Sequence, residues 1–395
     1  MSQQLISRSP DLKQLRDEGY DIEIKSTYLL IKSVPHVNSN KEIKFGTLVS
    51  DLILAGDVTT TPSDHVVRFA GDYPCNKDGS EISQIRHQSV NQTLDKDLVV
   101  NHSFSSKPNG GYKNYYDKMT TYVAIISSPA HSIDSNVTAT TFPVIEPSED
   151  ESVFHYFDTA SSRAGINVVT RKLELRKLGI VGVGGTGSYV LDLVAKSPVK
   201  EIHLFDGDKF SNHNAFRSPG APSIDELRNK PQKAFYFKEQ YSRMHRNIIP
   251  HDYYIDASNA DQLQGMDFVF LCIDANEAKR IIVESLEAFG ITFIDVGMGV
   301  DLVDDSLRGI LRVTTSTVKQ REHFRKRVSL ADAGSNDDYD RNIQIAELNA
   351  LNAAMAVIKW KKLCGFYLDF ENEHHSTYTM DGNMLLNEDR LCSEK

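Results

Sequence analysis

The sequence predicts an α/β protein: a Rossmann-like, doubly wound and mostly parallel sheet, preceded by a smaller N-terminal domain that is β-rich or α+β. Three observations predict this fold class. In the second half, short apolar strands alternate with amphipathic helical segments, as expected when helices connect parallel strands. A glycine-rich turn follows the first of those strands, at residues 182–187. The first half has strand patterns separated by turns and little helical periodicity.

The strand patterns of the first half come in order along the chain. DIEIKSTYLLIKSV at 21–34 predicts two strands, and HVVRFAGDYPCNKDGSEI at 65–82 predicts a strand followed by a turn. TTYVAIIS at 120–127 is rich in strand-forming residues and predicts a further strand. Prolines and an acidic cluster at 141–152 are typical of a linker. We therefore expect two domains, 1–152 and 153–395, within a chain of 395 residues.

The second half contains four apolar segments that predict strands and two amphipathic segments that predict the helices between them. The strands are LGIVGV at 178–183, EIHLFD at 201–206, FVFLCID at 268–274 and TFIDVG at 292–297, and the helices are YVLDLVAKS at 189–197 and EAKRIIVESLEAF at 277–289.

A longer helix is predicted near the end of the chain, after a polar segment at 318–342. Ile345, Leu348, Met355 and Ile358 recur at helical spacing, which predicts that they lie in the core. The polar segment is long for a loop inside a domain, and such loops tend to be mobile or functional. We expect it to be a crossover loop.

The composition of the chain argues against several classes of protein. The formal net charge of −10 argues against a nucleic-acid protein, because phosphate binding usually needs a basic surface. No apolar run approaches the roughly 20 residues of a membrane helix, and the polar N-terminus lacks the apolar core of a signal peptide, so a cytoplasmic protein is expected. The chain has no CxxC pair among its four cysteines and no ligand spacing among its scattered histidines, so we expect no structural zinc. These residues include Cys75, Cys272, Cys364, Cys392, His65, His87 and His102.

The glycine-rich turn predicts a phosphate site. Glycines let the backbone turn tightly and approach a phosphate, and the helix that we expect to open at Ser188 would offer unpaired N–H groups and a positive dipole end. Asp206 ends the next strand, where an acid accepts hydrogen bonds from ribose hydroxyls. The glycines are Gly182, Gly184, Gly185 and Gly187. By itself this pattern fits a nicotinamide or flavin cofactor as well as ATP.

The residues after Asp206 favour ATP with magnesium. Arg217 and a lysine provide positive charge for further phosphates, and Asn214 provides a neutral donor. Asp274, at the end of a parallel strand, can hold Mg²⁺ through one oxygen while phosphate and water complete the shell. The lysine is Lys230 or Lys233, and we favour Lys233 because Pro231 fits the first turn of a helix that carries it.

Taken together, these motifs resemble the ThiF/MoeB superfamily, which includes the ubiquitin-activating enzymes. GVGGTGS is similar to its GxGGxGS loop, and DGDKFSNHNAFRS, which contains Asp208, is similar to its DxDxVxxSNLxRQ motif. The resemblance covers about residues 155–365. It implies that Asp206 and Asp208 belong to the nucleotide site, that Asn214 and Arg217 contact phosphates, and that Asp274 positions the metal.

The same resemblance does not decide which lysine contacts the phosphates, and it implies a dimer. KPQKA resembles the family's KPKA, which gives Lys233, but its spacing from Arg217 is three residues longer than usual, and Lys230 lies at the usual distance. In dimeric members an upstream arginine reaches the partner's ATP, and Arg163 is the best match. A surface arginine capping a short helix is the alternative interpretation. The N-terminal half resembles a module that precedes activating-enzyme domains in some bacterial proteins and has no assigned function.

The reaction that the resemblance implies is adenylation of the C-terminal carboxylate of a ubiquitin-like protein ending in glycine, followed by transfer to a conjugating-type carrier. Ubiquitin-activating enzymes use a cysteine in the crossover region, but this sequence has none between Cys272 and Cys364, and both of these are expected to be packed. Three acceptors remain: a thiol of a partner protein, Cys392, or a hydroxyl. The hydroxyl would belong to Ser329 or Ser335, with His323 as its base.

Other functions remain as alternatives. An activator of a sulfur-carrier protein shares the first step, although many such enzymes carry paired CxxC motifs, which are missing here. An enzyme that adenylates a carboxylate on a tRNA base would need a basic face. A nicotinamide oxidoreductase would leave Arg217 and Asp274 without a role. An inactive scaffold subunit would lack several of the phosphate and metal groups.

Overall fold

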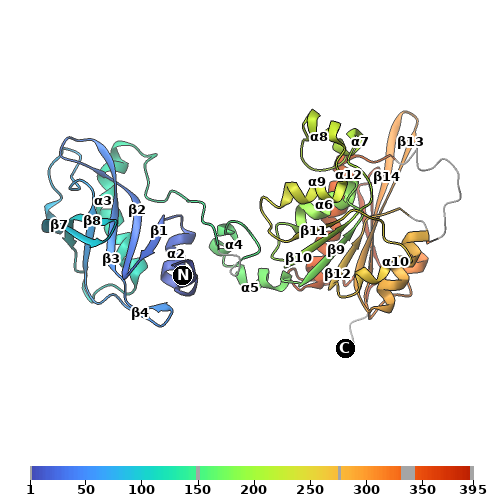
Figure 1. Cartoon of the computed structure of the whole chain (residues 1–395), viewed down its shortest axis with the longest axis horizontal. Coiled ribbons are helices and arrows are strands. Elements are labelled where there is room, and N and C mark those ends of the chain that lie inside the picture. Colours follow the sequence, from blue (N-terminus) through green and yellow to red (C-terminus); the bar gives the residue numbers. More distant parts are fainter. Residues whose placement is uncertain (1, 148–151, 275–276, 331–342, 392–395) are drawn as a thin grey trace. The chain divides into compact units, whose positions relative to one another are not determined.

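The computed structural model describes residues 2–147, 152–274, 277–330 and 343–391. The chain divides into two compact units. Unit 1 comprises Met1–Pro147 and Tyr156–Gly165, and unit 2 comprises Ser148–His155 and Ile166–Lys395. Figure 1 shows the elements of each unit. No helix in the described part of the chain is both long enough and apolar enough to cross a membrane.

Unit 1 is a six-stranded antiparallel sheet with the order β1-β2-β3-β6-β8-β7, and helix α3 packs against β2. The strands expected at 21–34 and 65–82 are confirmed as β1, β2 and β6. The elements are α1 (Ser2–Arg8), α2 (Pro10–Asp17), β1 (Ile22–Lys25), β2 (Tyr28–Val37), β3 (Ile43–Asp51), β4 (Leu54–Ala55), β5 (Val58–Thr59), β6 (Val66–Ala70), η1 (Ser83–Ile85), β7 (Arg86–Asp95), β8 (Leu98–Ser105), α3 (Tyr115–Ile133) and α4 (Thr159–Arg163).

The strand expected at 120–127 is wrong, because these residues lie inside α3. The buried side chains of this helix are spaced three or four residues apart, from Tyr115 through Met119 and Tyr122 to Ile126. This is the spacing of one helical face. Asn114 caps the helix by accepting a hydrogen bond from the Asp117 backbone N–H at 2.9 Å. Burial against the sheet therefore outweighs the strand preference of the individual residues.

Unit 2 is an eight-stranded sheet with the order β11-β10-β9-β12-β13-β14-β15-β16. The strands from β11 to β13 pair in parallel and the last three join antiparallel, so the predicted mostly parallel α/β fold is confirmed. All four predicted strands are present. The strands are β9 (Lys177–Val181), β10 (Glu201–Phe205), β11 (Ile248–His251), β12 (Phe268–Leu271), β13 (Thr292–Val303), β14 (Ser306–Ser316), β15 (His375–Thr379) and β16 (Met384–Glu388).

Helices cover both faces of this sheet (Figure 1). One face packs against α6, α9 and α12, and the other packs against α10 and η3. The two predicted helices are confirmed as α6 and α10. The helical elements are α5 (Asn167–Thr170), η2 (Arg171–Leu173), α6 (Gly185–Val194), α7 (Asn212–Ala215), α8 (Ile224–Asn229), α9 (Lys233–Tyr241), η3 (Ala260–Leu263), α10 (Glu277–Ala288), α11 (Phe324–Arg327) and α12 (Ala346–Leu363).

Helix α12 is the long helix expected near the end of the chain, but its buried face differs from the prediction. Leu348 is buried as expected, whereas Ile358 is 47% exposed. Its buried residues in the core shared with α6 are alanines, Val357 and Trp360, and the Trp360 ring lies against Phe268 and Phe270 of β12. Strand β9 lies between β10 and β12. From β9 the chain adds β10 and β11 on one side, and then crosses to add β12 and β13 on the other side. Ligands bind where the strand order reverses in this way.

Candidate nucleotide-binding site

The glycine-rich turn joins β9 to α6 at the carboxyl edge of the parallel strands. Gly182 has a φ of +84°, and a Cβ there would lie 2.7 Å from the carbonyl oxygen of Cys272. A Cβ on Gly187 would lie 1.8 Å from the carbonyl oxygen of Gly182. Around Gly184, by contrast, a Cβ would meet no described atom within 4 Å. Two glycines therefore close the turn, and a third leaves its backbone open to a ligand.

Helix α6 begins at Gly185, three residues earlier than the sequence predicts. Ser188 consequently lies inside the first turn, where it is buried and its hydroxyl donates to the carbonyl of Gly185 at 2.7 Å. The positive end of the helix dipole lies at Gly184 and Gly185, next to the open part of the turn. An anion at this point would meet backbone N–H groups.

Asp206 follows β10 and holds the turn in place. Its Oδ2 accepts the backbone N–H of Val183 at 2.8 Å, and its Oδ1 accepts that of Asp208 at 2.9 Å. The residue is 7% exposed. Burial raises the pKa of the Asp206 carboxyl, and the positive charge of Lys233 offsets part of that rise. Each carboxylate oxygen retains a lone pair, so the group can still accept bonds from a ligand's hydroxyls.

Lys233 is the first residue of α9 and faces both acids. Its Nζ lies 2.7 Å from Oδ2 of Asp208 and 3.8 Å from Oδ1 of Asp206. The Tyr254 hydroxyl also donates to Asp208. Burial by itself would raise the pKa of Asp208, but the hydrogen bonds from Lys233 and Tyr254 outweigh it and hold that pKa below its usual value. Lys233 therefore lies close to Asp206, the acid expected to bind the ribose.

The other lysine candidate lies apart from these acids. Lys230 is the exposed C-cap of α8, with a φ of +44°. Pro231 does not lie in the first turn of the next helix, as the sequence argument assumed, because Gln232 is the N-cap of α9 and Pro231 precedes it. The carbonyl oxygen of Pro231 instead accepts the backbone N–H of Phe210 at 2.7 Å. The backbone N–H of Lys233 donates to the carbonyl oxygen of Asp208 at 2.8 Å, which places Lys233 beside the acids.

Asn214 and Arg217 lie on and just after the short helix α7. Asn214 is 2% exposed, its Oδ1 accepts the backbone N–H of Ser211 at 2.9 Å, and its Nδ2 is buried without a hydrogen-bond partner among the described residues. A buried donor of this kind is costly unless a ligand or water accepts from it. Arg217 is half-buried. Both residues belong to the segment that follows Asp206 at the end of β10.

Asn349 of α12 is a residue of this site that the sequence argument missed. It is 1% exposed, accepts from the Thr186 hydroxyl at 2.8 Å and donates to the backbone oxygen of Arg217 at 3.2 Å. It therefore ties the glycine-rich turn to the segment that carries Arg217. The signal in the sequence is a polar residue on the buried face of an otherwise apolar helix.

Asp274 follows β12 and is exposed at the same edge of the sheet. Nearby, Asp295 of β13 is fully buried between Lys279, at 2.5 Å, and Arg312, at 2.7 Å. No group of three or more His, Cys, Asp or Glu in the described part of the chain is arranged to hold a metal ion. A single carboxylate still fits Mg²⁺, which is commonly bound through one or two carboxylates plus substrate phosphates and water.

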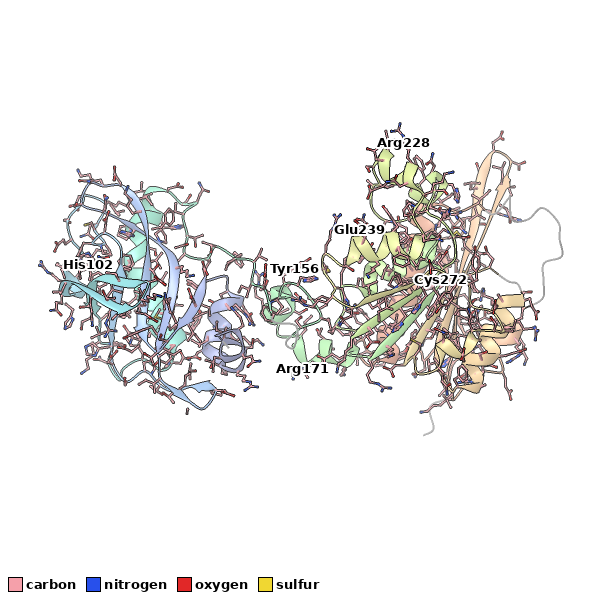
Figure 2. The ribbon with its side chains drawn as sticks, in the orientation of Figure 1. His102, Tyr156, Arg171, Arg228, Glu239 and Cys272 are labelled. Carbon is pink, nitrogen blue, oxygen red and sulfur yellow. The ribbon has the colours of Figure 1, made fainter. Side chains whose placement is uncertain are left out.

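The cysteines of unit 2 that the structure describes are not activated thiols. Cys272, labelled in Figure 2, directly follows β12, where burial and then the charge of Asp295 raise the pKa of its thiol far above the usual value. Burial raises the pKa of Cys364 to about 11. Since the thiolate is the nucleophile, neither thiol is suited to accept an acyl group. Cys392 lies outside the described residues.

The remaining candidates that the structure describes have other neighbours within their own units. Arg163 lies in α4 of unit 1, where its guanidinium stands 5.2 Å from the centre of the Phe142 ring. Ser329 is exposed, and His323 is buried with its Nε2 2.9 Å from the carbonyl of Thr315. Ser335 lies outside the described residues.

In unit 1, Cys75 is buried and the scattered histidines have ordinary partners. The ring nitrogens of His87 and His102 lie 2.9 and 3.0 Å from serine hydroxyls, and the backbone oxygen of His65 accepts from the Tyr122 hydroxyl.

The fold and the site define a nucleotide-binding α/β protein, with a glycine-rich turn and an acid at the switch point of a mostly parallel sheet. Comparison with protein families makes this more specific. Residues 160–372, more than half of the chain, match the ThiF family. The chain belongs to the ThiF family, and this membership supports ATP-dependent adenylation as its chemistry. Residues 10–159 match a domain of unknown function, DUF6791.

The chain is also similar to individual proteins. It is 24% identical to the mouse ubiquitin-like modifier-activating enzyme 5 in an alignment 165 residues long, which covers 38% of this chain and 40% of that relative. The chain thus spans less than half the length of this relative. Among solved structures, PaaA shares 18% identity over 57% of this chain and 76% of its own, with a TM-score of 0.45. MccB of E. coli shares 17% identity over 57% of this chain and 65% of its own, with a TM-score of 0.44.

Proposed function

We propose that this protein uses ATP to adenylate the C-terminal carboxylate of a ubiquitin-like protein. The observation that carries the proposal is the gathering of the open glycine turn, Asp206, Lys233 and the Arg217 segment at one edge of the sheet. Asn349 joins two of these parts directly. A dinucleotide needs only the turn and the acid, whereas additional cationic groups suit a triphosphate.

In the proposed reaction, an oxygen of the partner's carboxylate attacks the α-phosphorus of ATP. The bond from that phosphorus to the oxygen of the leaving pyrophosphate breaks, giving an acyl adenylate and pyrophosphate. The protein contributes in-line positioning and charge stabilisation rather than acid–base chemistry. Lys233 and Arg217 would stabilise the phosphate charge, and the backbone at Gly184 would bind a phosphate oxygen. Asp274 would hold Mg²⁺, which supplies further charge neutralisation when bound.

A protein substrate is supported by the exposed apolar surface of the antiparallel strands. Ile310 of β14 is 43% exposed, and three residues of the edge strand β16, which β15 separates from β14, are also exposed. These are Met384 at 56%, Leu385 at 57% and Leu386 at 46%. Met384 and Leu386 share one face of β16 and Leu385 lies on the other. Exposed apolar side chains on an edge strand suit contact with another protein. A small-molecule substrate would give it no role.

For the second step, we propose that a thiol of a partner carrier protein attacks the acyl carbon of the adenylate. The thioester bond forms, the bond from that carbon to the AMP oxygen breaks, AMP leaves, and the thiol proton is released to solvent. The raised pKa values of the Cys272 and Cys364 thiols speak against an acceptor on either residue. Cys392 and the hydroxyls of Ser329 and Ser335 remain the alternatives within this chain. A thioester on the carrier breaks in excess thiol, whereas an ester on a serine resists thiol and breaks in mild base.

We also propose a homodimer in which Arg163 approaches the partner's ATP.

The test of the first step is ATP–pyrophosphate exchange with ubiquitin-like proteins ending in glycine. Exchange should require the free terminal carboxylate and should fall about 100-fold or more in Lys233→Ala, since removing one donor that stabilises the transition state costs about that much. Lys238→Ala, on the same helix, is the matched control and should keep the wild-type rate. Lys230→Ala separates the two lysine candidates, because the exchange rate should fall in this variant only if Lys230 contacts the phosphates.

The same assay distinguishes the alternatives. Exchange with a sulfur-carrier protein only, or with tRNA only, would assign one of those substrates instead. Tight NAD binding without exchange would overturn adenylation altogether.

A further inference from the structure

Tyr254 is an exposed aromatic residue, and binding of the ATP phosphates and ribose does not explain its position. It lies three residues beyond β11, the edge strand that pairs in parallel with β10, so it emerges at the same edge as Asp206. The backbone N–H of Asp206 donates to the carbonyl of His251 at 3.1 Å, which fixes the two strand ends side by side. Tyr254 is nevertheless 62% exposed.

The ring of Tyr254 lies against Gly207, the residue between the two acids. A Cβ on Gly207 would stand 2.9 Å from two ring carbons of Tyr254 and 3.1 Å from a third. Any larger residue at this position would displace the ring. The close approach therefore depends on glycine, and it brings an aromatic surface within one residue of Asp206.

Local hydrogen bonds hold the tyrosine in this position. Its hydroxyl donates to Asp208, and its backbone oxygen accepts from Nδ2 of Asn259 at 2.9 Å. The Asn259 side chain also accepts the backbone N–H of Asp256 at 2.8 Å, which closes the turn. Tyr254 is thus held at its hydroxyl and at its backbone, while much of the residue faces solvent. Ordering an exposed aromatic side chain before a ligand arrives lowers the entropy cost of binding.

We propose that Tyr254 is the residue on which the purine base of the nucleotide stacks, an inference that rests on the proposed use of ATP. In a nucleotide the base is bonded to the ribose carbon next to the 2′ hydroxyl, so a base whose ribose binds Asp206 lies within about one ring width of that acid. Tyr254 offers an aromatic face at that place. Stacking on an aromatic side chain needs no particular hydrogen-bond pattern and can contribute about tenfold or more in affinity.

Tyr254 also touches Asp208, which pairs with Lys233, so two modes of action must be separated. If the ring stacks on the base, its loss weakens binding of nucleotides but leaves binding of inorganic tripolyphosphate unchanged. If the hydroxyl acts instead by placing Asp208 and Lys233, its loss changes tripolyphosphate binding too. Tyr254→Phe keeps the ring and removes the hydroxyl, whereas Tyr254→Ala removes both.

The experiment is calorimetric binding of ATP and of inorganic tripolyphosphate to the full chain and its variants. We expect Tyr254→Ala to weaken ATP binding about tenfold, with tripolyphosphate binding unchanged and Tyr254→Phe close to wild type. Phe370→Ala removes another exposed aromatic ring, 87% exposed and distant in sequence, and is the matched control. An unchanged thermal midpoint in Tyr254→Ala verifies that the variant is folded.

Two results would overturn the inference while leaving the proposed function intact: wild-type ATP affinity in Tyr254→Ala, or an equal loss for ATP and tripolyphosphate. Failure of the wild-type protein to bind ATP would instead reject the proposed function.

Discussion

Replacing Asn349 with alanine should both destabilise unit 2 and weaken nucleotide binding, because one buried amide joins two parts of the site. The change removes the bonds to the Thr186 hydroxyl, at 2.8 Å, and to the Arg217 carbonyl, at 3.2 Å. Leaving a buried polar group unsatisfied costs about 1–3 kcal/mol. Because both partners are half-buried and water can replace part of the loss, we expect about 1–3 kcal/mol for the pair. That corresponds to a fall in thermal midpoint of roughly 2–4 °C for each kcal/mol.

The assay combines thermal unfolding with ATP titration, and Asn352→Ala is the matched control. Asn352 lies one turn further along α12, is fully buried and donates to the carbonyl of Gly297 at 3.0 Å, a contact outside the glycine-rich turn. Both variants should lose stability, but only Asn349→Ala should lose ATP affinity, by about fivefold or more for each 1 kcal/mol of lost positioning energy. Equal ATP affinities in the two variants would refute the positioning role of Asn349.

Three further predictions follow from the geometry. Gly187→Ala should lower stability by about 3 kcal/mol or more, because its Cβ would stand 1.8 Å from the Gly182 carbonyl oxygen. Gly184→Ala has open space at its Cβ but a φ of −74° and a ψ of −124°, which suit glycine better than alanine, so it should lower stability less in the same urea titration. Cys364, with a pKa of about 11 against about 9 for an unfolded thiol, keeps its proton in the folded state while the unfolded state loses it. The free energy of unfolding should therefore decline as pH rises between these two values, and Cys364→Ser should decline less steeply in urea titrations. Iodoacetamide at about pH 8 should label Cys272 and Cys364 only in denaturant, and rapid labelling of the native protein, read by mass spectrometry, would contradict the assignment of both as packed thiols.

The strand-turn-helix core of the site was predictable because its signals are local. The apolar strand before Gly182, the glycines and the acid at Asp206 each follow from a few neighbouring residues. The strand expected at 120–127 failed for the same reason. Eight residues rich in Tyr, Val and Ile fit a strand, and only the longer series from Tyr115 to Ile126 reveals the buried helical face.

The contacts that assemble the site could not be predicted from the sequence. Asn349 meets Arg217 across 132 positions and Tyr254 meets Asp208 across 46, and neither pair has a spacing rule. The antiparallel strands β15 and β16 return to β14 after the long helix α12, so their pairing is also set by the assembled sheet. Likewise, Ile358 is exposed because the face of α12 that packs on α6 is decided by the neighbouring helix.

In the proposed complex, one ATP molecule contacts the glycine-rich turn, Asp206, Lys233 and Arg217 together. A crystal structure of the chain with a non-hydrolysable ATP analogue and Mg²⁺ tests it most directly. Phosphate oxygens should lie within hydrogen-bonding distance of the Gly184 backbone and of both cationic side chains, with the ribose hydroxyls on Asp206. An analogue bound elsewhere, or bound at this edge with Lys233 and Arg217 turned away from its phosphates, would contradict it.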